Sequence, residues 1–322
     1  MTAAPPPGAA TATPPGTAPA PPAPSPTGPG RDADRRATLR GCALMTASMA
    51  CFACEDALIK SLGGRVPAAQ IIWMLGLGGT LALGALLLAR GRALWAPGLG
   101  GRRVALRTLA DAAGAAMFVP ALVLVPLATA SAVIQATPLV VALGAALFLG
   151  QRVGPRRWAA IAAGFGGVLL ILRPGGAAFD PAVLLAVGGM LALAVRDLAT
   201  RGLPPTLSGT HLSMLAFAAI VPAGAALQLA LGQPVVAPTA PQWAILGGCL
   251  AFGLTGYVAI VGATRAGDIA VVSSFRYARM QFALALAALF FGERPDAATL
   301  AGIAVVVAAG LYTLVREARA GS

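Results

Sequence analysis

The chain has 322 residues, of which 58% are hydrophobic and only 11% are charged, and its mean hydropathy is +0.81. A soluble domain carries about 25% charged residues, so this composition excludes a water-soluble globular protein for most of the chain. The formal net charge of +12 would suggest a nucleic-acid partner in a soluble protein, but the basic residues lie between apolar runs, where they indicate membrane topology, and no nucleic acid is expected.

The N-terminal segment differs from the rest of the chain. Residues 1–30 are almost entirely Pro, Ala, Thr and Gly, without a charged side chain. Such a segment cannot bury enough apolar surface to fold, so we expect residues 1–37 to form a disordered cytoplasmic tail. Four arginines then precede the first apolar run: Arg31, Arg35, Arg36 and Arg40.

Ten apolar segments follow the tail, each close to the ~20 residues that span a bilayer as a helix. Clusters of glycine and proline separate them. The fold class predicted is an all-α integral membrane protein with ten transmembrane helices. The predicted helices are residues 39–59, 68–89, 104–124, 129–149, 156–172, 181–200, 208–230, 242–263, 269–291 and 297–315.

Lysine and arginine are distributed unequally over the loops between these helices. If the N-terminus is cytoplasmic, most of the 23 Lys and Arg residues fall on the cytoplasmic side. Basic residues concentrate in cytoplasmic loops, so both termini are predicted to be cytoplasmic. The opposite side holds only Lys60, Arg65, Arg173 and Arg294.

An internal repeat divides the chain into two halves. Residues 126–172 align without gaps on residues 268–314, and the match is best between 146–152 and 288–294. We therefore expect two five-helix repeats, at 38–175 and 180–316. Five is an odd number, so the repeats enter the membrane from opposite sides. Inverted repeats are typical of alternating-access transporters, whose site lies near the midplane between the halves.

Each half ends in an apolar run, a Phe-x-Gly-[Glu/Gln]-Arg break and a second apolar run. This pattern resembles the EamA family of the drug/metabolite transporter superfamily, and the resemblance covers about residues 38–316. It departs at Gln151, where many members have Glu, so a gate in that loop would lack a carboxylate. The matching residues are Phe52, 56–58, Lys60, 127–128, 150–153, 164–172, 290–293 and 300–311.

The resemblance implies a secondary transporter of the bacterial inner membrane that moves a small organic metabolite by alternating access. The solute would be amino-acid-, vitamin- or drug-like. The resemblance also implies a central cavity, lined mainly by the first, third, fourth, sixth, eighth and ninth helices.

Charged residues within the predicted helices are the candidate site residues, since each costs roughly 2.5–3.5 kcal/mol to insert. Arg276 and Arg279 are three residues apart and should share one helix face. They need carboxylates or an anionic solute group, and Arg suits bidentate carboxylate recognition. Solute anchoring and structural pairing with Asp111 or Glu55 remain alternatives.

Two polar residues at equivalent positions of the repeats, Gln135 and Tyr277, are expected beside the solute. Asp56 could pair with Lys60, four residues on, and Asp111 should reach a partner on another helix. Adjacent helical residues do not face each other, so Arg196 and its neighbour Asp197 should each need a separate partner. The candidate coupling or counter-ion residues are Glu55, Asp56, Asp111, Asp197 and Arg196.

Motifs for catalysis are missing from the sequence. It has no HExxH zinc motif, P-loop or Gly-x-Ser-x-Gly elbow, so no enzymatic activity, no cofactor and no metal are predicted. The single histidine, His211, is expected to be a solvated residue at a helix end. The expected partners are a small-molecule solute and membrane lipid; a coupling proton and a monomeric or homodimeric state are left open.

Two alternatives to this function remain. One is a sugar-phosphate or nucleotide-sugar exchanger of the same superfamily. The other is a membrane-embedded enzyme with paired carboxylates, which is disfavoured because the acidic residues are spread over different helices and depths.

Overall fold

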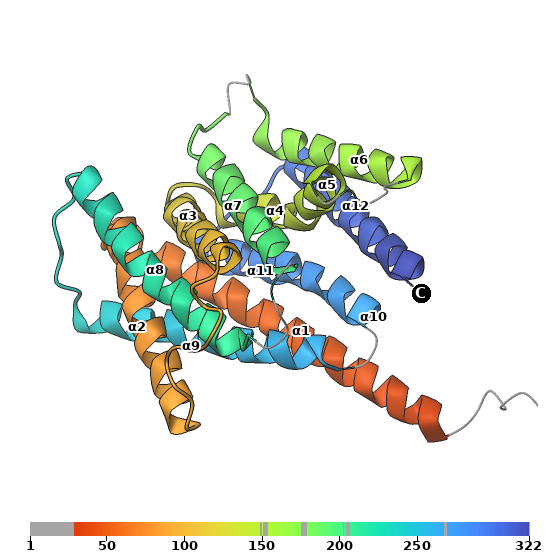
Figure 1. The fold of residues 1–322 in the computed structure, drawn as a ribbon. Coiled ribbons are helices and arrows are strands. Elements are labelled where there is room, and N and C mark those ends of the chain that lie inside the picture. The colour runs from red at the N-terminus through yellow and green to blue at the C-terminus, as the bar shows by residue number, and fades with distance from the viewer. Residues whose placement is uncertain are drawn as a thin grey trace, which may run out of the picture.

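The computed structural model describes residues 29–148, 150, 154–174, 179–201, 203, 207–266 and 269–321, and these residues form helices and their connecting loops without a strand (Figure 1). For 29–34, 201, 269–270 and 317–321 it describes the backbone alone. The helices are α1 (Pro29–Leu62), α2 (Ala68–Ala89), α3 (Arg102–Leu124), α4 (Leu127–Ile134), α5 (Thr137–Phe148), α6 (Pro155–Leu172), α7 (Val183–Arg201), α8 (Gly209–Ala230), α9 (Ala240–Thr264), α10 (Ile269–Ser274), the 3-10 turn η1 (Phe275–Tyr277), α11 (Ala278–Phe291) and α12 (Ala297–Gly321).

The all-helical membrane fold predicted from composition is confirmed. Within the described residues, nine helical segments are long and apolar enough to cross a bilayer, counting 127–148 as one. The ninth predicted segment, 269–291, is not among them, because it is divided among α10, η1 and α11. The chain is therefore a multi-pass membrane protein.

Two helix ends differ from the prediction. Helix α1 begins at Pro29, so residues 29–37 are helical and are not part of the tail. Helix α12 continues to Gly321, beyond the predicted end at 315. Apolar runs predict only the part of a helix that lies in the membrane. Ala, Arg and Glu also favour helix in water, so these helices can continue beyond the apolar run. Residues 1–28 lie outside the described part of the chain.

The fourth and ninth predicted helices are interrupted, which the sequence analysis missed. Pro138 has no N–H to donate to the carbonyl of Ile134, four residues earlier, and the hydroxyl of Thr137 donates to that carbonyl instead, at 2.5 Å. Helix α4 therefore ends at Ile134 and α5 begins at Thr137. In the second repeat the interruption is η1, and its last residue, Tyr277, is the repeat equivalent of Gln135.

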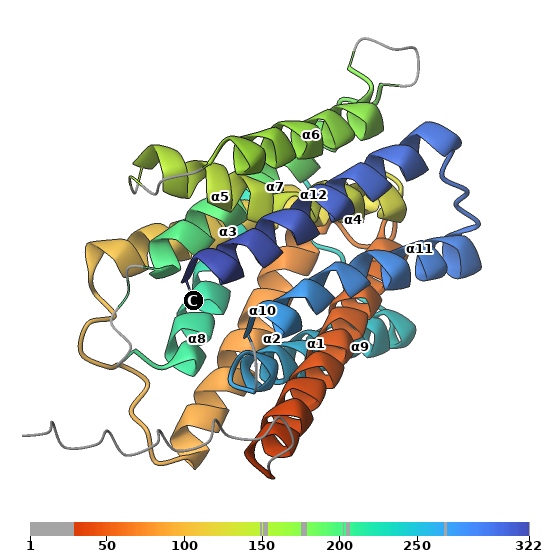
Figure 2. The same ribbon diagram turned by 90° about the vertical axis from the view of Figure 1, so that its right-hand side faces the viewer.

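The packing of the helices follows the pseudo-twofold symmetry of an inverted repeat. Helix α1 packs along α9, and the equivalent pair, α7 and α3, also packs together. Two further pairs consist of equivalent helices, α2 with α8 and α6 with α12 (Figures 1 and 2). The symmetry is not exact, because α3 packs extensively against α8 while α9 makes only a small contact with α2.

The helices are closely packed around α4 and between α6 and α12. Every residue of α4 except Thr129 is buried, which places this helix at the centre of the core. At the α6–α12 contact, a Cβ added to Gly302 would lie 2.7 Å from the carbonyl oxygen of Gly167. Small residues allow such close backbone approach between membrane helices.

Candidate functional site

A cavity of about 340 Å³ lies between the repeats, and we call it the central cavity. It is lined from α1, α3, α4, α7, α9 and α11, as the family resemblance implied, and in addition from α2 and α8. Its walls carry the aromatic side chains of Phe52, Phe118, Phe217 and Tyr257 together with charges of both signs. Apolar cavities with a few convergent polar groups are typical small-molecule sites.

On one wall of the central cavity, Arg279 pairs with Asp56. The guanidinium donates to Asp56 Oδ2 through Nη2 at 2.5 Å and through Nε at 3.2 Å. Its Cζ lies 5.6 Å from the centroid of the Phe52 ring. The Asp56 side chain is only 5% exposed. The expected Asp56–Lys60 pair does not form, because each residue finds a partner on a segment distant in sequence.

On the opposite wall, Asp111 joins two arginines. Its carboxylate forms an ion pair with Arg107 at 3.2 Å and accepts a hydrogen bond from Arg196 of α7 at 3.4 Å, so it does reach a partner on another helix. Arg196 also pairs with the adjacent Asp197, at 2.8 Å. The expectation that neighbours on a helix cannot pair is wrong here, since the long arginine side chain can bend back to the next residue.

Glu55 also lines the central cavity. It forms no ion pair with any residue whose side chain the structure describes. The absence of a side chain at Gly253 on α9 makes room for it, because a Cβ there would lie 2.7 Å from Glu55 Oε1. Glu55 is therefore the carboxylate of this cavity whose charge is not balanced by a direct partner within the described ranges.

Arg276 and Arg279 do not serve the same cavity, contrary to the prediction. Arg276 lines a second cavity of about 310 Å³, together with Tyr277, Asp197 and residues of α5 and α12. We call this the α12 cavity. The 3-10 turn replaces regular helix just before Arg279, so a face assignment based on helical spacing does not hold.

Gln135 lies at the interruption between α4 and α5. Its side-chain amide donates to the carbonyl oxygen of Arg276 at 3.3 Å. This bond joins the interruption of the first repeat to that of the second.

An ion pair with a capping role lies where α1 and α11 end and α4 begins. Lys60 Nζ lies 3.3 Å from Glu293 Oε1 and donates to the carbonyl of Val125 at 2.6 Å. Glu293 in turn accepts from the backbone N–H of Leu127 at 2.8 Å and of Ala128 at 3.2 Å. A carboxylate at a helix N-terminus satisfies free N–H groups and the positive end of the helix dipole. We call Lys60, Glu293 and the start of α4 the latch.

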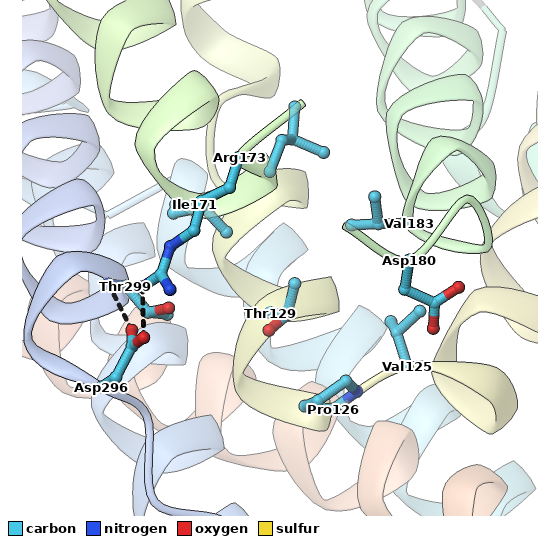
Figure 3. A pocket seen from close by; sticks show the side chains of 10 residues that line it. Val125, Pro126, Thr129, Ile171, Arg173, Asp180, Val183, Asp296 and Thr299 are labelled. Atoms are coloured by element: carbon cyan, nitrogen blue, oxygen red, sulfur yellow. Dashed lines mark hydrogen bonds and ion pairs between the residues drawn. The ribbon is translucent and has the colours of Figure 1, made fainter. Parts of the chain in front are cut away.

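Next to the latch lies a third cavity of about 200 Å³, between α4, α6 and the start of α12 (Figure 3). Arg173 reaches across it to Asp296, which also accepts from the N–H of Thr299 and so caps α12. The Arg173 hydrogen bond and then the Thr299 contacts hold the pKa of the Asp296 carboxyl well below its usual range. Asp180, in the loop before α7, also lines this cavity.

Two polar residues have roles that the sequence analysis missed. His211 is buried rather than solvated, and its Nε2 lies 2.8 Å from the carbonyl of Ala93. Glu293 was noted only as part of a repeated motif. The sequence did contain a signal, because the repeats differ at this position, with Glu293 in the second and Gln151 in the first. Spacing along the chain could not show, however, that Glu293 caps α4. Gln151 lies outside the described residues.

Known proteins resemble the chain over much of its length. A family model described as the EamA-like transporter family matches residues 39–173. A riboflavin transporter of Rhizobium johnstonii is 33% identical over 216 residues, which are 66% of this chain and 70% of the relative. A pseudopaline exporter of Pseudomonas aeruginosa is 30% identical over 271 residues, which are 80% of this chain and 90% of that relative.

An S-adenosylmethionine uptake transporter of Rickettsia prowazekii is 27% identical over 207 residues, covering 62% of this chain and 67% of that relative. A crystal structure superposes with a TM-score of 0.58 at 23% identity, covering 89% of this chain and 99% of the other. At that identity the superposition supports the fold alone.

Proposed function

Because the chain belongs to the EamA-like transporter family, we propose that it moves a small organic metabolite across the bacterial inner membrane by alternating access. The central cavity is the solute site. The observation that carries this proposal is that Asp56–Arg279 and Asp111–Arg196 each join one repeat to the other across the cavity. A movement of one repeat against the other must lengthen or break these pairs, and a solute between them replaces their contacts.

The moving units are the repeats 38–175 and 180–316. Both termini are cytoplasmic, and the latch lies at the outer end, as the distribution of basic residues favours. Interrupted helices at the repeat interface form the solute sites of many transporters. The interruptions beside Gln135 and at Tyr277 lie at this interface, although neither residue lines the central cavity itself.

The solute is vitamin-like, amino-acid-like or drug-like, with an aromatic ring and polar or charged groups. Four aromatic side chains can stack on a ring. A solute carboxylate would compete with Asp56 for Arg279, which is the anchor we assign. The three relatives above are named for different metabolites, and we take all three kinds of metabolite as candidate solutes for this chain.

Glu55 is the coupling carboxylate that we propose. It has no direct cationic partner among the described side chains, and it lies one residue from Asp56 on the cavity wall. An ionisable side chain within a membrane helix that lacks a paired charge is a candidate site for a coupling proton. If Glu55 binds a proton when the solute leaves, the transport of the proton is coupled to the transport of the solute.

The experiment is uptake and counterflow in proteoliposomes that contain the purified full-length chain. Radiolabelled riboflavin, S-adenosylmethionine, aromatic amino acids and glucose 6-phosphate are offered, after a thermal-shift screen of the same compounds, since ligands that bind the folded state stabilise it. Recovery of the accumulated compound in unchanged form would separate transport from an enzymatic reaction. Counterflow with glucose 6-phosphate alone would instead favour the sugar-phosphate exchanger.

For the solute found, Arg279→Gln should lower transport at least tenfold while the protein remains folded. Arg265→Gln is the matched control, because Arg265 is an exposed residue at the end of α9 that lines none of the three cavities. Equal activity of the two variants would refute the assignment of Arg279 as anchor.

A further inference from the structure

We propose that the α12 cavity is a second binding site, separate from the central cavity, which takes the carboxylate of a small organic acid. Arg276 and the hydroxyl of Tyr277 are the two groups that bind it. The site does not depend on the central cavity carrying the solute.

The first argument is the charge of Arg276. Arg107, Arg196 and Arg279 each have a carboxylate within 3.4 Å. For Arg276, in contrast, no ion pair is formed with any acidic side chain in the described ranges, and its side chain is exposed to the cavity. A guanidinium within a membrane protein is costly unless an anion or water compensates it, so the cavity favours an anionic occupant.

The second argument is the hydroxyl of Tyr277. The residue is only 3% exposed, and its hydroxyl has no hydrogen-bond partner among the described residues. A buried hydroxyl without a partner costs about 1–3 kcal/mol. Glycine at position 310 of α12 makes its position possible, because a Cβ there would overlap the Tyr277 hydroxyl.

The other polar groups of this cavity are already engaged. The hydroxyl of Thr200 donates to the carbonyl of Arg196, and that of Thr313 donates to the carbonyl of Ala309. Asp197 is paired with Arg196. The groups left over, a guanidinium and a phenolic O–H, are both donors, so the ligand must supply acceptors.

The rest of the lining selects among acceptor groups. Pro138, Val141 and Leu314 are apolar, and they suit a ligand with a hydrocarbon body. The volume of about 310 Å³ lies at the lower end of the range of ligand pockets, roughly 300–1,000 Å³. A carboxylate fits the planar fork of arginine, so a short-chain organic carboxylate matches charge, hydrogen bonding and size together.

The test uses phenylglyoxal, which modifies free guanidinium groups, on the purified full-length protein, with each arginine read by peptide mass spectrometry. Arg276 should react several-fold faster than the paired Arg279. Hexanoate should slow the reaction of Arg276 at least fivefold, whereas hexanamide at the same ionic strength should not. The reaction of Arg265 serves as the internal reference and should not respond to hexanoate.

The conservative variant Tyr277→Phe tests the second donor. It should raise the hexanoate concentration needed for protection about tenfold, because the bound carboxylate loses one hydrogen bond. Unchanged protection would remove Tyr277 from the site.

Three results would overturn the proposal. Equal protection by hexanoate and hexanamide would mean that the carboxylate is not recognised. Protection by inorganic phosphate and not by hexanoate would assign the site to a phosphate group. Reactivity of Arg276 only in the Asp197→Asn variant would mean that Arg276 pairs with Asp197 in solution. None of these readings requires transport, so failure here and failure of the proposed function are distinguishable.

Discussion

The latch makes a quantitative prediction about access to the central cavity. The variant Glu293→Gln keeps the shape of the side chain and one acceptor oxygen but removes its charge. In the structure that charge faces Lys60 and two N–H groups of α4, and both side chains of the ion pair are only 14% exposed. The variant should therefore weaken closure at this end while leaving the fold intact.

The magnitude follows from the interactions that a neutral side chain weakens. A hydrogen bond to a charged group contributes about 1.5–3 kcal/mol and a neutral one about 0.5–1.5 kcal/mol. A negative charge at a helix N-terminus adds about 0.3–1 kcal/mol, and up to ~2 kcal/mol when partly buried. Loss of the charge should destabilise the closed state at this end by about 2–3 kcal/mol, which raises the open population about 30- to 140-fold at 1.4 kcal/mol per factor of ten.

The assay is the labelling rate of a cysteine inside the cavity by an impermeant maleimide. Val119 lines the central cavity and is buried, so Val119→Cys is placed in a background in which Cys42, Cys51, Cys54 and Cys249 are alanine. Glu293→Gln should raise the labelling rate about 30-fold or more in intact cells. The same reagent applied to inside-out vesicles tests the orientation of the latch.

The control is Asp296→Asn, which removes the same charge from the same loop without touching α1 or α4. Its labelling rate should stay within about twofold of the parent. If Glu293→Gln also stayed within that range, the latch would not hold this end closed, and the energetic argument from capping would be wrong.

Asp56→Asn should lower the free energy of unfolding by about 3 kcal/mol, because it leaves Arg279 as an unpaired buried charge. In thermal denaturation, the double variant with Arg279→Gln should recover part of this loss; a double variant less stable than Asp56→Asn would contradict the pairing. Asp296→Asn should lower the thermal stability equally at pH 5 and pH 8. The pKa of Asp296 is held below its usual range, so its contribution is fully present above the ordinary value of about 3.9 and is lost only as the pH falls through the folded-state pKa; a loss that differs between pH 5 and pH 8 would refute this. Gly302→Val should lower the melting temperature by several degrees, because a Cβ there meets the backbone of α6 at 2.7 Å, whereas Gly247→Ala, with nothing within 4 Å of the new Cβ, should not. Equal melting temperatures for these two variants would exclude the close contact.

The sequence predicted the scaffold well, because bilayer thickness and helix hydrophobicity are local constraints. Helix α2 has the predicted bounds, 68–89. The interruption near Pro138 had a readable cause, the missing N–H of proline. The interruption at η1 has no such cause in the sequence, since Phe275–Tyr277 contains neither Gly nor Pro. Only the equivalence of Tyr277 to Gln135 in the repeat indicates this second interruption.

The partners of the charged residues were harder to predict. Helical spacing suggested Asp56 with Lys60, but Asp56 pairs with Arg279, 223 positions away, and Lys60 pairs with Glu293. A contact between neighbours on one exposed helix face contributes about 0.2–0.5 kcal/mol, much less than the roughly 3–5 kcal/mol lost when a buried charge is left without its partner. Partner choice therefore depends on the arrangement of the repeats, which spacing along one helix does not encode.

The hydrogen bond from Gln135 to the carbonyl of Arg276 has a mechanical consequence. Eight residues separate Leu127 from Gln135, so the bond lies about 12 Å below the start of α4, near the middle of a hydrocarbon layer about 30 Å thick. In the proposed movement of one repeat against the other, a point where the two are bonded moves least, so we expect this bond to act as their fulcrum. Changes at the latch reach one end of the pathway, whereas a change at this fulcrum reaches both ends at once.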